Sequence, residues 1–234
     1  HMPQTRRNGF EEYKRQHIPN SIFFDLDENS KKDTKLPHML VQEEDWNNIV
    51  SKMGINNTDK IVIYDNSDVI SSCRLWFNLI YFGHNAKLVH VLNGGFQKWL
   101  SEKKRVTDQV SGTDNSNYKS LEKKELVKDK IMIDKNVDVQ DFKLIDGRSK
   151  DRFHGKIPEP REGLRSGSIK NSFCIPFNTC LNEDRTFKKK SELEKIFKEC
   201  LEDLNEKNIV FSCGSGVTAC VLALAYSLIN DKYL

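Results

Sequence analysis

Two short segments of this chain occur twice, and this internal repetition limits the folds that the chain can adopt. Ile-Pro-Asn-Ser at 18–21 matches Ile-Lys-Asn-Ser at 169–172, and Ile-Val-Ile-Tyr-Asp at 61–65 matches Ile-Val-Phe-Ser-Cys at 209–213. The members of the two pairs are separated by nearly the same number of residues, which indicates a duplicated structural unit. A chain of 234 residues is long enough for two such units.

Each half of the chain alternates short apolar runs with longer helical patterns. In the first half we expect strands at 22–24, 61–64 and 88–92, and helices at 6–16, 42–52, 71–82 and 96–100. In the second half we expect strands at 142–145, 172–176 and 209–211, and helices at 190–201 and 217–229. Strands that alternate with helices predict an α/β fold with a mostly parallel sheet, flanked by helices, in each half.

A polar stretch at 107–120, rich in Ser, Asn, Asp and Gly, separates the two patterns. It is typical of an interdomain linker. We therefore predict a first domain at 1–107, a linker at 108–124 and a second domain at 125–234.

Composition excludes several classes of protein. The net charge of +3, with 30% charged residues, gives no support for nucleic-acid binding. The sequence has no apolar run of membrane-spanning length, so we expect no membrane partner. The six cysteines form no Cys-x-x-Cys pair and no metal-binding spacing. This indicates free thiols in a reducing compartment, so we expect a cytoplasmic protein without a metal or cofactor.

The segment at 208–220 carries the most specific chemical signal. An apolar run, Ile-Val-Phe at 209–211, is followed by Cys213, a glycine-containing loop and a long apolar helix pattern. A cysteine just before a helix N-terminus is close to backbone N–H groups and to the positive end of the helix dipole, which stabilise a thiolate. The alternative is a buried cysteine of the core, and this is our interpretation of Cys220.

The loop sequence Cys-Gly-Ser-Gly-Val-Thr-Ala at 213–219 resembles the active-site loop of 3-mercaptopyruvate sulfurtransferases, in the rhodanese superfamily. The resemblance covers most of the chain and implies two tandem rhodanese-like domains. Related thiosulfate sulfurtransferases carry charged residues just after the cysteine, whereas Gly214 and Ser215 stand there in this chain. Asp65 occupies the position of Cys213 in the first repeat, so the first domain is expected to be non-catalytic.

The resemblance also implies roles for individual residues. Cys213 is the expected nucleophile and persulfide carrier. The anionic sulfur is expected to be held by backbone N–H groups of the loop and of the start of the helix. These N–H groups belong to Gly214, Ser215, Gly216, Val217 and Thr218. Arg152 and Arg161 match arginines that bind mercaptopyruvate, and a planar guanidinium suits a carboxylate.

The resemblance further implies a proton-handling set and two structural residues. Ser215, His38 and Asp27 match the proton-handling residues, and Asp27 and His38 would reach Ser215 only across an interdomain cleft. Asp146 and Arg148 match a structural position at the sheet edge. Members of the family also have strand-forming sequence before His1 and after Leu234, so we expect the first domain to be truncated at its start and the second at its end.

Three other functions are alternatives to this one, and the sequence argues against two of them. A thiosulfate sulfurtransferase would use the same fold and nucleophile. A cysteine phosphatase needs an arginine six residues after the cysteine, where this chain has Ala219. A non-catalytic binding module would not need Cys213 or the two arginines, so their presence argues against this function. For the sulfurtransferase, the expected partners are a small-molecule sulfur donor and a thiol acceptor such as thioredoxin or a low-molecular-weight thiol, or cyanide.

Overall fold

The computed structural model describes residues 5–206, 208–230 and 233. The chain forms two compact units, His1–Lys123 and Lys124–Leu234, which we call the first and second unit. The boundary between them falls at the end of the predicted linker. The outer limits predicted for the two domains, residues 1 and 234, lie outside the described residues.

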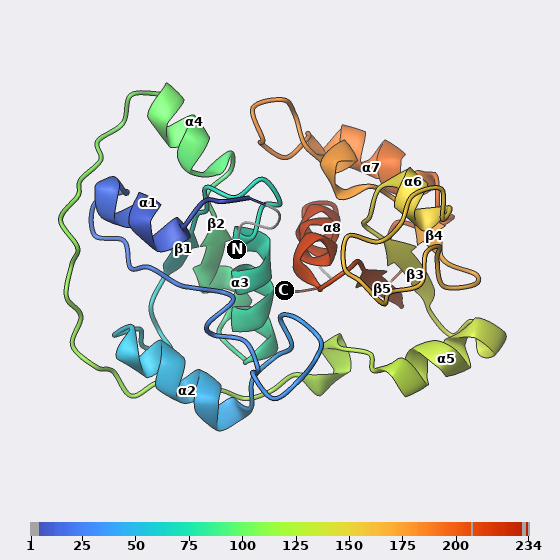
Figure 1. The fold of residues 1–234 in the computed structure, drawn as a ribbon, viewed down its shortest axis with the longest axis horizontal. Coiled ribbons are helices and arrows are strands. Elements are labelled where there is room, and N and C mark those ends of the chain that lie inside the picture. Colours follow the sequence, from blue (N-terminus) through green and yellow to red (C-terminus); the bar gives the residue numbers. More distant parts are fainter. Residues whose placement is uncertain (1–4, 207, 231–232, 234) are drawn as a thin grey trace. The chain divides into compact units, whose positions relative to one another are not determined.

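The first unit contains a two-stranded parallel sheet and helices around it (Figure 1). Its elements are α1 (Gly9–Arg15), α2 (Glu43–Lys52), β1 (Ile61–Ile63), α3 (Ser72–Tyr81), η1 (Ala86–Leu88), β2 (Val89–Val91) and α4 (Gly95–Ser101). β1 pairs with β2, with Ile61 opposite Val89. Trp46 of α2 stacks on Phe82 at the end of α3, with ring centroids 4.6 Å apart, and both rings are fully buried.

The second unit contains a three-stranded parallel sheet in the order β4-β3-β5. Its elements are η2 (Lys124–Leu126), α5 (Lys130–Val139), β3 (Lys143–Asp146), α6 (Lys150–Phe153), β4 (Phe173–Cys174), η3 (Phe177–Cys180), α7 (Lys190–Lys198), β5 (Ile209–Ser212) and α8 (Val217–Ser227). α8 is apolar on nearly every face and packs against β5, α7 and η3 (Figure 1). A helix that is buried on every side needs apolar residues on every face, which explains the long apolar run at 217–227.

Most of the expected elements are present, and the prediction of parallel sheets flanked by helices is confirmed. The strand predicted at 22–24 is wrong, because these residues have no strand assignment in the structure. Two helices of the second unit, α5 and α6, were not predicted. α5 leaves the side chains of Ile131 and Met132 exposed, so its apolar residues do not form the one-sided pattern that reveals a helix.

The end of the polar stretch packs against the first unit. Ser116 N–H donates to the carbonyl of Ser51, and Leu121 N–H to that of Phe82. Between them, the side chain of Tyr118 is 1% exposed. The carboxyl-terminal part of the predicted linker is therefore fixed to the first unit rather than being a free tether.

Across the described residues, none of the helices has both the length and the apolar character needed to cross a membrane.

Candidate active site

Cys213 lies directly after β5, at the carboxyl edge of the sheet in the second unit. Gly216 follows in the left-handed conformation, with φ of 76°, and is the N-cap residue of α8. Its N–H donates to Sγ of Cys213 across 3.2 Å. A residue with a Cβ is strained at such a φ, so glycine is required for this turn. The loop therefore directs a backbone donor at the sulfur.

Two other cysteines of this unit, Cys174 and Cys180, are in environments that oppose thiolate formation. Burial raises the pKa of the Cys174 thiol to about 11, with a contribution from nearby Asp146, and burial raises that of Cys180 to about 12. Cys220 is buried, as predicted, and its thiol donates to the carbonyl of Gly216 across 3.0 Å. The position that combines partial exposure with a helix N-terminus is that of Cys213.

The two predicted arginines converge on the loop beside Cys213. Arg152 belongs to α6, and Arg161 lies in the long loop that follows this helix. Nη2 of Arg161 donates to the carbonyl of Gly214. A Cβ placed on Gly214 would lie 3.1 Å from Nη2 of Arg152 and equally close to Nη2 of Arg161. The absence of a side chain at Gly214 therefore leaves room for both guanidinium groups.

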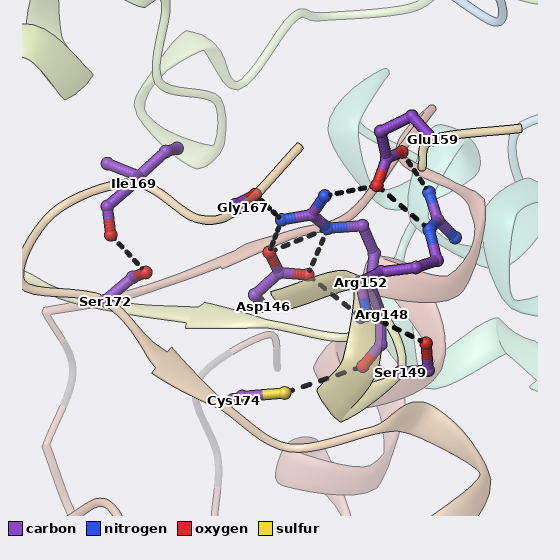
Figure 2. A network of polar contacts seen from close by, with 9 residues as sticks. All are labelled: Asp146, Arg148, Ser149, Arg152, Glu159, Gly167, Ile169, Ser172 and Cys174. Carbon is purple, nitrogen blue, oxygen red and sulfur yellow. Dashed lines mark hydrogen bonds and ion pairs between the residues drawn. The ribbon is translucent and has the colours of Figure 1, made fainter. Parts of the chain in front are cut away.

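Arg152 is held in place by Glu159, a residue that the sequence analysis did not single out (Figure 2). Nε of Arg152 donates to Oε1 of Glu159 across 3.1 Å, and Nη2 donates to Oε2 across 2.5 Å. The side chain of Glu159 is only 4% exposed, whereas that of Arg152 is 24% exposed. The only feature of the sequence that marks Glu159 is its position between two prolines, in the loop that carries Arg161.

Glu159 in turn joins Arg152 to the end of β3 (Figure 2). Its Oε1 also accepts from Nη1 of Arg148 across 2.8 Å, and Arg148 Nη2 donates to Oδ2 of Asp146 across 2.7 Å. Asp146 is the last residue of β3 and is 4% exposed. Hydrogen bonds and ion pairs with the two arginines, first that with Arg152, lower the pKa of Glu159. The network therefore stays charged and ties Arg152 to the sheet.

The predicted pair Asp27 and His38 lies in the first unit. Nε2 of His38 is 2.8 Å from Oδ1 of Asp27, and the carbonyl of His38 accepts from Nη2 of Arg74 across 2.7 Å. Burial lowers the pKa of His38 below its usual value, and the hydrogen bond with Asp27 offsets this only in part. Ser215 is a half-buried residue of the second unit. Its contact with Asp27 and His38 stays a prediction.

A comparison with protein-family models decides what kind of chain carries this loop. The model of the rhodanese-like domain matches twice, at residues 6–102 and 125–232. The chain belongs to the rhodanese family. The two matches agree with the internal repetition of the sequence, and the second rhodanese-like match contains Cys213 and both arginines.

Curated rhodanese relatives match almost the whole chain. Thiosulfate/3-mercaptopyruvate sulfurtransferase 1, mitochondrial, from Arabidopsis thaliana is 37% identical over 96% of this chain and 64% of its own length. Thiosulfate sulfurtransferase from Rattus norvegicus is 36% identical over 96% of this chain and 75% of its own length. The chain thus spans about two thirds to three quarters of these relatives.

Among solved structures, that of SseA from Escherichia coli is similar, with a TM-score of 0.86 and 28% sequence identity. The match covers 97% of this chain and 83% of SseA, which is described with the rhodanese fold and catalytic mechanism of 3-mercaptopyruvate sulfotransferases.

Proposed function

We propose that this chain is a sulfurtransferase that moves sulfur from 3-mercaptopyruvate, through a persulfide on Cys213, to a thiol acceptor or cyanide. The observation that carries the proposal is the convergence of Arg152 and Arg161 on Gly214, next to a cysteine whose Sγ accepts an N–H from Gly216. A nucleophilic sulfur and two cations that suit the oxygens of an α-keto acid are thereby brought to one loop.

The reaction proceeds in two stages. The Cys213 thiolate attacks the sulfur of mercaptopyruvate, and the carbon–sulfur bond breaks as its electron pair passes to carbon. Pyruvate leaves as its enolate and takes up a proton. An acceptor thiolate then attacks the outer sulfur of the persulfide, and Cys213 leaves as a thiolate. Such a cycle shows ping-pong kinetics.

The loop and the arginines have distinct tasks in this reaction. The N–H groups of the loop and of the first turn of α8 stabilise the anionic sulfur, because the first N–H groups of a helix have no acceptor within the helix. Arg152 and Arg161 hold the carboxylate and the keto oxygen. Ser215, with His38 and Asp27, handles the proton of the departing enolate.

The acceptor and the location of the protein complete the proposal. The sulfur acceptor is a low-molecular-weight thiol or the thiol of a protein such as thioredoxin, and either needs only access to the persulfide on Cys213. A cytoplasmic location suits free cysteines, although the name of the Arabidopsis relative places that protein in mitochondria.

The nucleophile is tested with Cys213→Ser and Cys220→Ser. After treatment with mercaptopyruvate, we expect intact-protein mass spectrometry to show one added sulfur, roughly 32 Da, on the unaltered protein and on Cys220→Ser. Cys213→Ser should gain no sulfur and release no pyruvate, with an unchanged far-ultraviolet circular dichroism spectrum. Sulfur on Cys220 instead of Cys213 would overturn the assignment.

A second candidate is a thiosulfate sulfurtransferase, which the similarity to the rat enzyme of that name favours. Thiosulfate is a compact dianion, and the residues after Cys213 give it N–H groups and a hydroxyl but no side-chain cation. Arg152 and Arg161 instead provide two separate cations, which suit the oxygens of mercaptopyruvate.

Donor choice is tested with the two arginine variants. Loss of one charge-assisted contact corresponds to about a ten- to hundred-fold weaker binding. We therefore expect Arg152→Ala and Arg161→Ala each to raise KM for mercaptopyruvate by about this factor. Arg165→Ala, at an exposed position of the same loop, is the control and should leave KM unchanged. A higher kcat/KM of the unaltered protein for thiosulfate would instead establish the second candidate.

A further inference from the structure

His38 has an unusual backbone conformation for a residue that carries a side chain. Its φ is 57°, in the left-handed region, where Cβ comes close to the following carbonyl oxygen. Such a conformation persists only where the surrounding structure fixes it, and residues of this kind gather at functional sites. The side chain of His38 is 6% exposed. The contacts that fix His38 are therefore relevant to its proposed role in proton transfer.

Two hydrogen bonds fix the backbone around His38. The N–H of Lys31 donates to the carbonyl of Met39 across 2.9 Å, and this bond joins the two halves of the loop that contains His38. Nη2 of Arg74 donates to the carbonyl of His38 itself across 2.7 Å. The second bond attaches His38 to α3, the helix to which Arg74 belongs.

Arg74 is well suited to serve as this anchor. It is 7% exposed, and its helix packs against β1 and β2 (Figure 1). A guanidinium group stays charged and has a planar shape, and hydrogen bonds from a charged donor are stronger than those between neutral groups. The bond from Arg74 therefore holds the carbonyl of His38 in a fixed position relative to the sheet of the first unit.

The backbone conformation of His38 determines where its imidazole ring lies. Nε2 is 2.8 Å from Oδ1 of Asp27. An ionised carboxylate only accepts hydrogen bonds, so Nε2 carries the proton of the neutral ring, and Nδ1 is the nitrogen that can take up another. Burial lowers the pKa of His38, and the charge of Arg74 adds to this effect, whereas Asp27 opposes it. The ring is therefore neutral at neutral pH and can accept a proton at Nδ1.

We propose that Arg74 is a positioning residue for the proton-handling set of Ser215, His38 and Asp27. Its hydrogen bond maintains the left-handed conformation of His38. This conformation places Nε2 against Asp27 and leaves Nδ1 as the nitrogen that exchanges a proton. Arg74 acts through His38 and has no direct task in binding the sulfur donor. The inference rests on the role of His38 in the proposed sulfurtransferase reaction.

Two sulfur donors distinguish a role in proton handling from damage to the fold. Pyruvate leaves mercaptopyruvate as an enolate that has to take up a proton, whereas sulfite leaves thiosulfate as a stable anion that needs none. We expect Arg74→Gln to lower kcat for pyruvate release about ten-fold, the effect of losing one charge-assisted contact. It should lower kcat for sulfur transfer from thiosulfate to cyanide far less. Arg74→Lys keeps the charge and should recover part of the loss with mercaptopyruvate.

The tautomer of His38 gives a readout that does not depend on activity. Nitrogen-15 NMR of the imidazole ring should show a proton on Nε2 in the unaltered protein and in Arg74→Lys. In Arg74→Gln we expect a mixture of the two tautomers, because the ring is no longer held against Asp27. The same tautomer in all three proteins would show that Arg74 does not position His38.

Arg105→Gln, which replaces an exposed arginine of the same unit, is the matched control and should change neither rate. His38→Gln tests the underlying function and should lower pyruvate release at least as much as Arg74→Gln. If Arg74→Gln lowers both rates equally, Arg74 is a structural residue and the inference is overturned. Unchanged pyruvate release in Arg74→Gln, beside a reduced rate in His38→Gln, also overturns it. Unchanged pyruvate release in His38→Gln would remove the proton-handling set from the proposed function, and this inference with it.

Discussion

The side chain of Glu159 contacts two arginines at once, in a position from which water is nearly excluded. Its two oxygens fix Nε and Nη2 of Arg152, so the orientation of this guanidinium group depends on Glu159. Charge-assisted bidentate pairs of this kind give geometric specificity as well as energy. Glu159 is therefore a positioning residue in the proposed site.

We predict that Glu159→Gln raises KM for mercaptopyruvate about ten-fold and changes kcat less. The uncharged amide keeps the size of the side chain but loses the charge-assisted contact, which corresponds to roughly this factor. Steady-state kinetics of pyruvate release measure both constants. Glu162→Gln, an exposed change in the same loop, is the matched control. If both variants bind mercaptopyruvate equally well, Glu159 does not position Arg152.

The residues of the proposed site differ in how far the sequence reveals them. Cys213 follows from the order strand, loop and helix, which places a cysteine at a helix N-terminus. Arg152 and Arg161 depend on the resemblance to a known family, because an arginine in a loop is otherwise expected to be exposed. Glu159 was missed because its role comes from the folding of the loop between the two arginines, which no local pattern encodes.

At the scale of elements, apolar length and periodicity predict most helices and strands. β5 and α8 are examples, since a short run at 209–211 and a long one after 217 match a buried strand and a buried helix. The segment 22–24 shows the limit of this approach. Its sequence, Ile-Phe-Phe, favours a strand, but strand formation also requires a paired neighbour. Within the described part of the first unit, no strand pairs with residues 22–24.

At the scale of the whole molecule, the polar composition of 107–120 predicted an interdomain linker, but it does not say whether such a linker is free or fixed. Composition describes the average of a segment, whereas one side chain decides whether the segment is fixed. Tyr118 is buried, and its hydroxyl is 3.1 Å from Nδ1 of His84. Burial raises the pKa of Tyr118 to about 12, consistent with its place in the interior of the first unit.

We predict that Tyr118→Ala destabilises the chain by about 3 to 5 kcal/mol, the range for truncating a buried aromatic side chain. Urea unfolding followed by tryptophan fluorescence reports this change through Trp46 of the same unit. Leu121→Ala, three residues further along the predicted linker but 75% exposed, should alter stability by no more than about 0.5 kcal/mol. If the stretch is a free tether in solution, the two variants will unfold alike.

The left-handed conformation of Gly216 has a consequence for protein engineering. Ser215 already carries a side chain, whereas at 216 any other residue would be strained. At 214 a side chain would crowd the guanidinium groups of Arg152 and Arg161. A combinatorial library aimed at new sulfur donors should therefore randomise 215 and keep glycine at 214 and 216. Such a library varies charge and size beside the nucleophile, and it retains the backbone donor that every member needs.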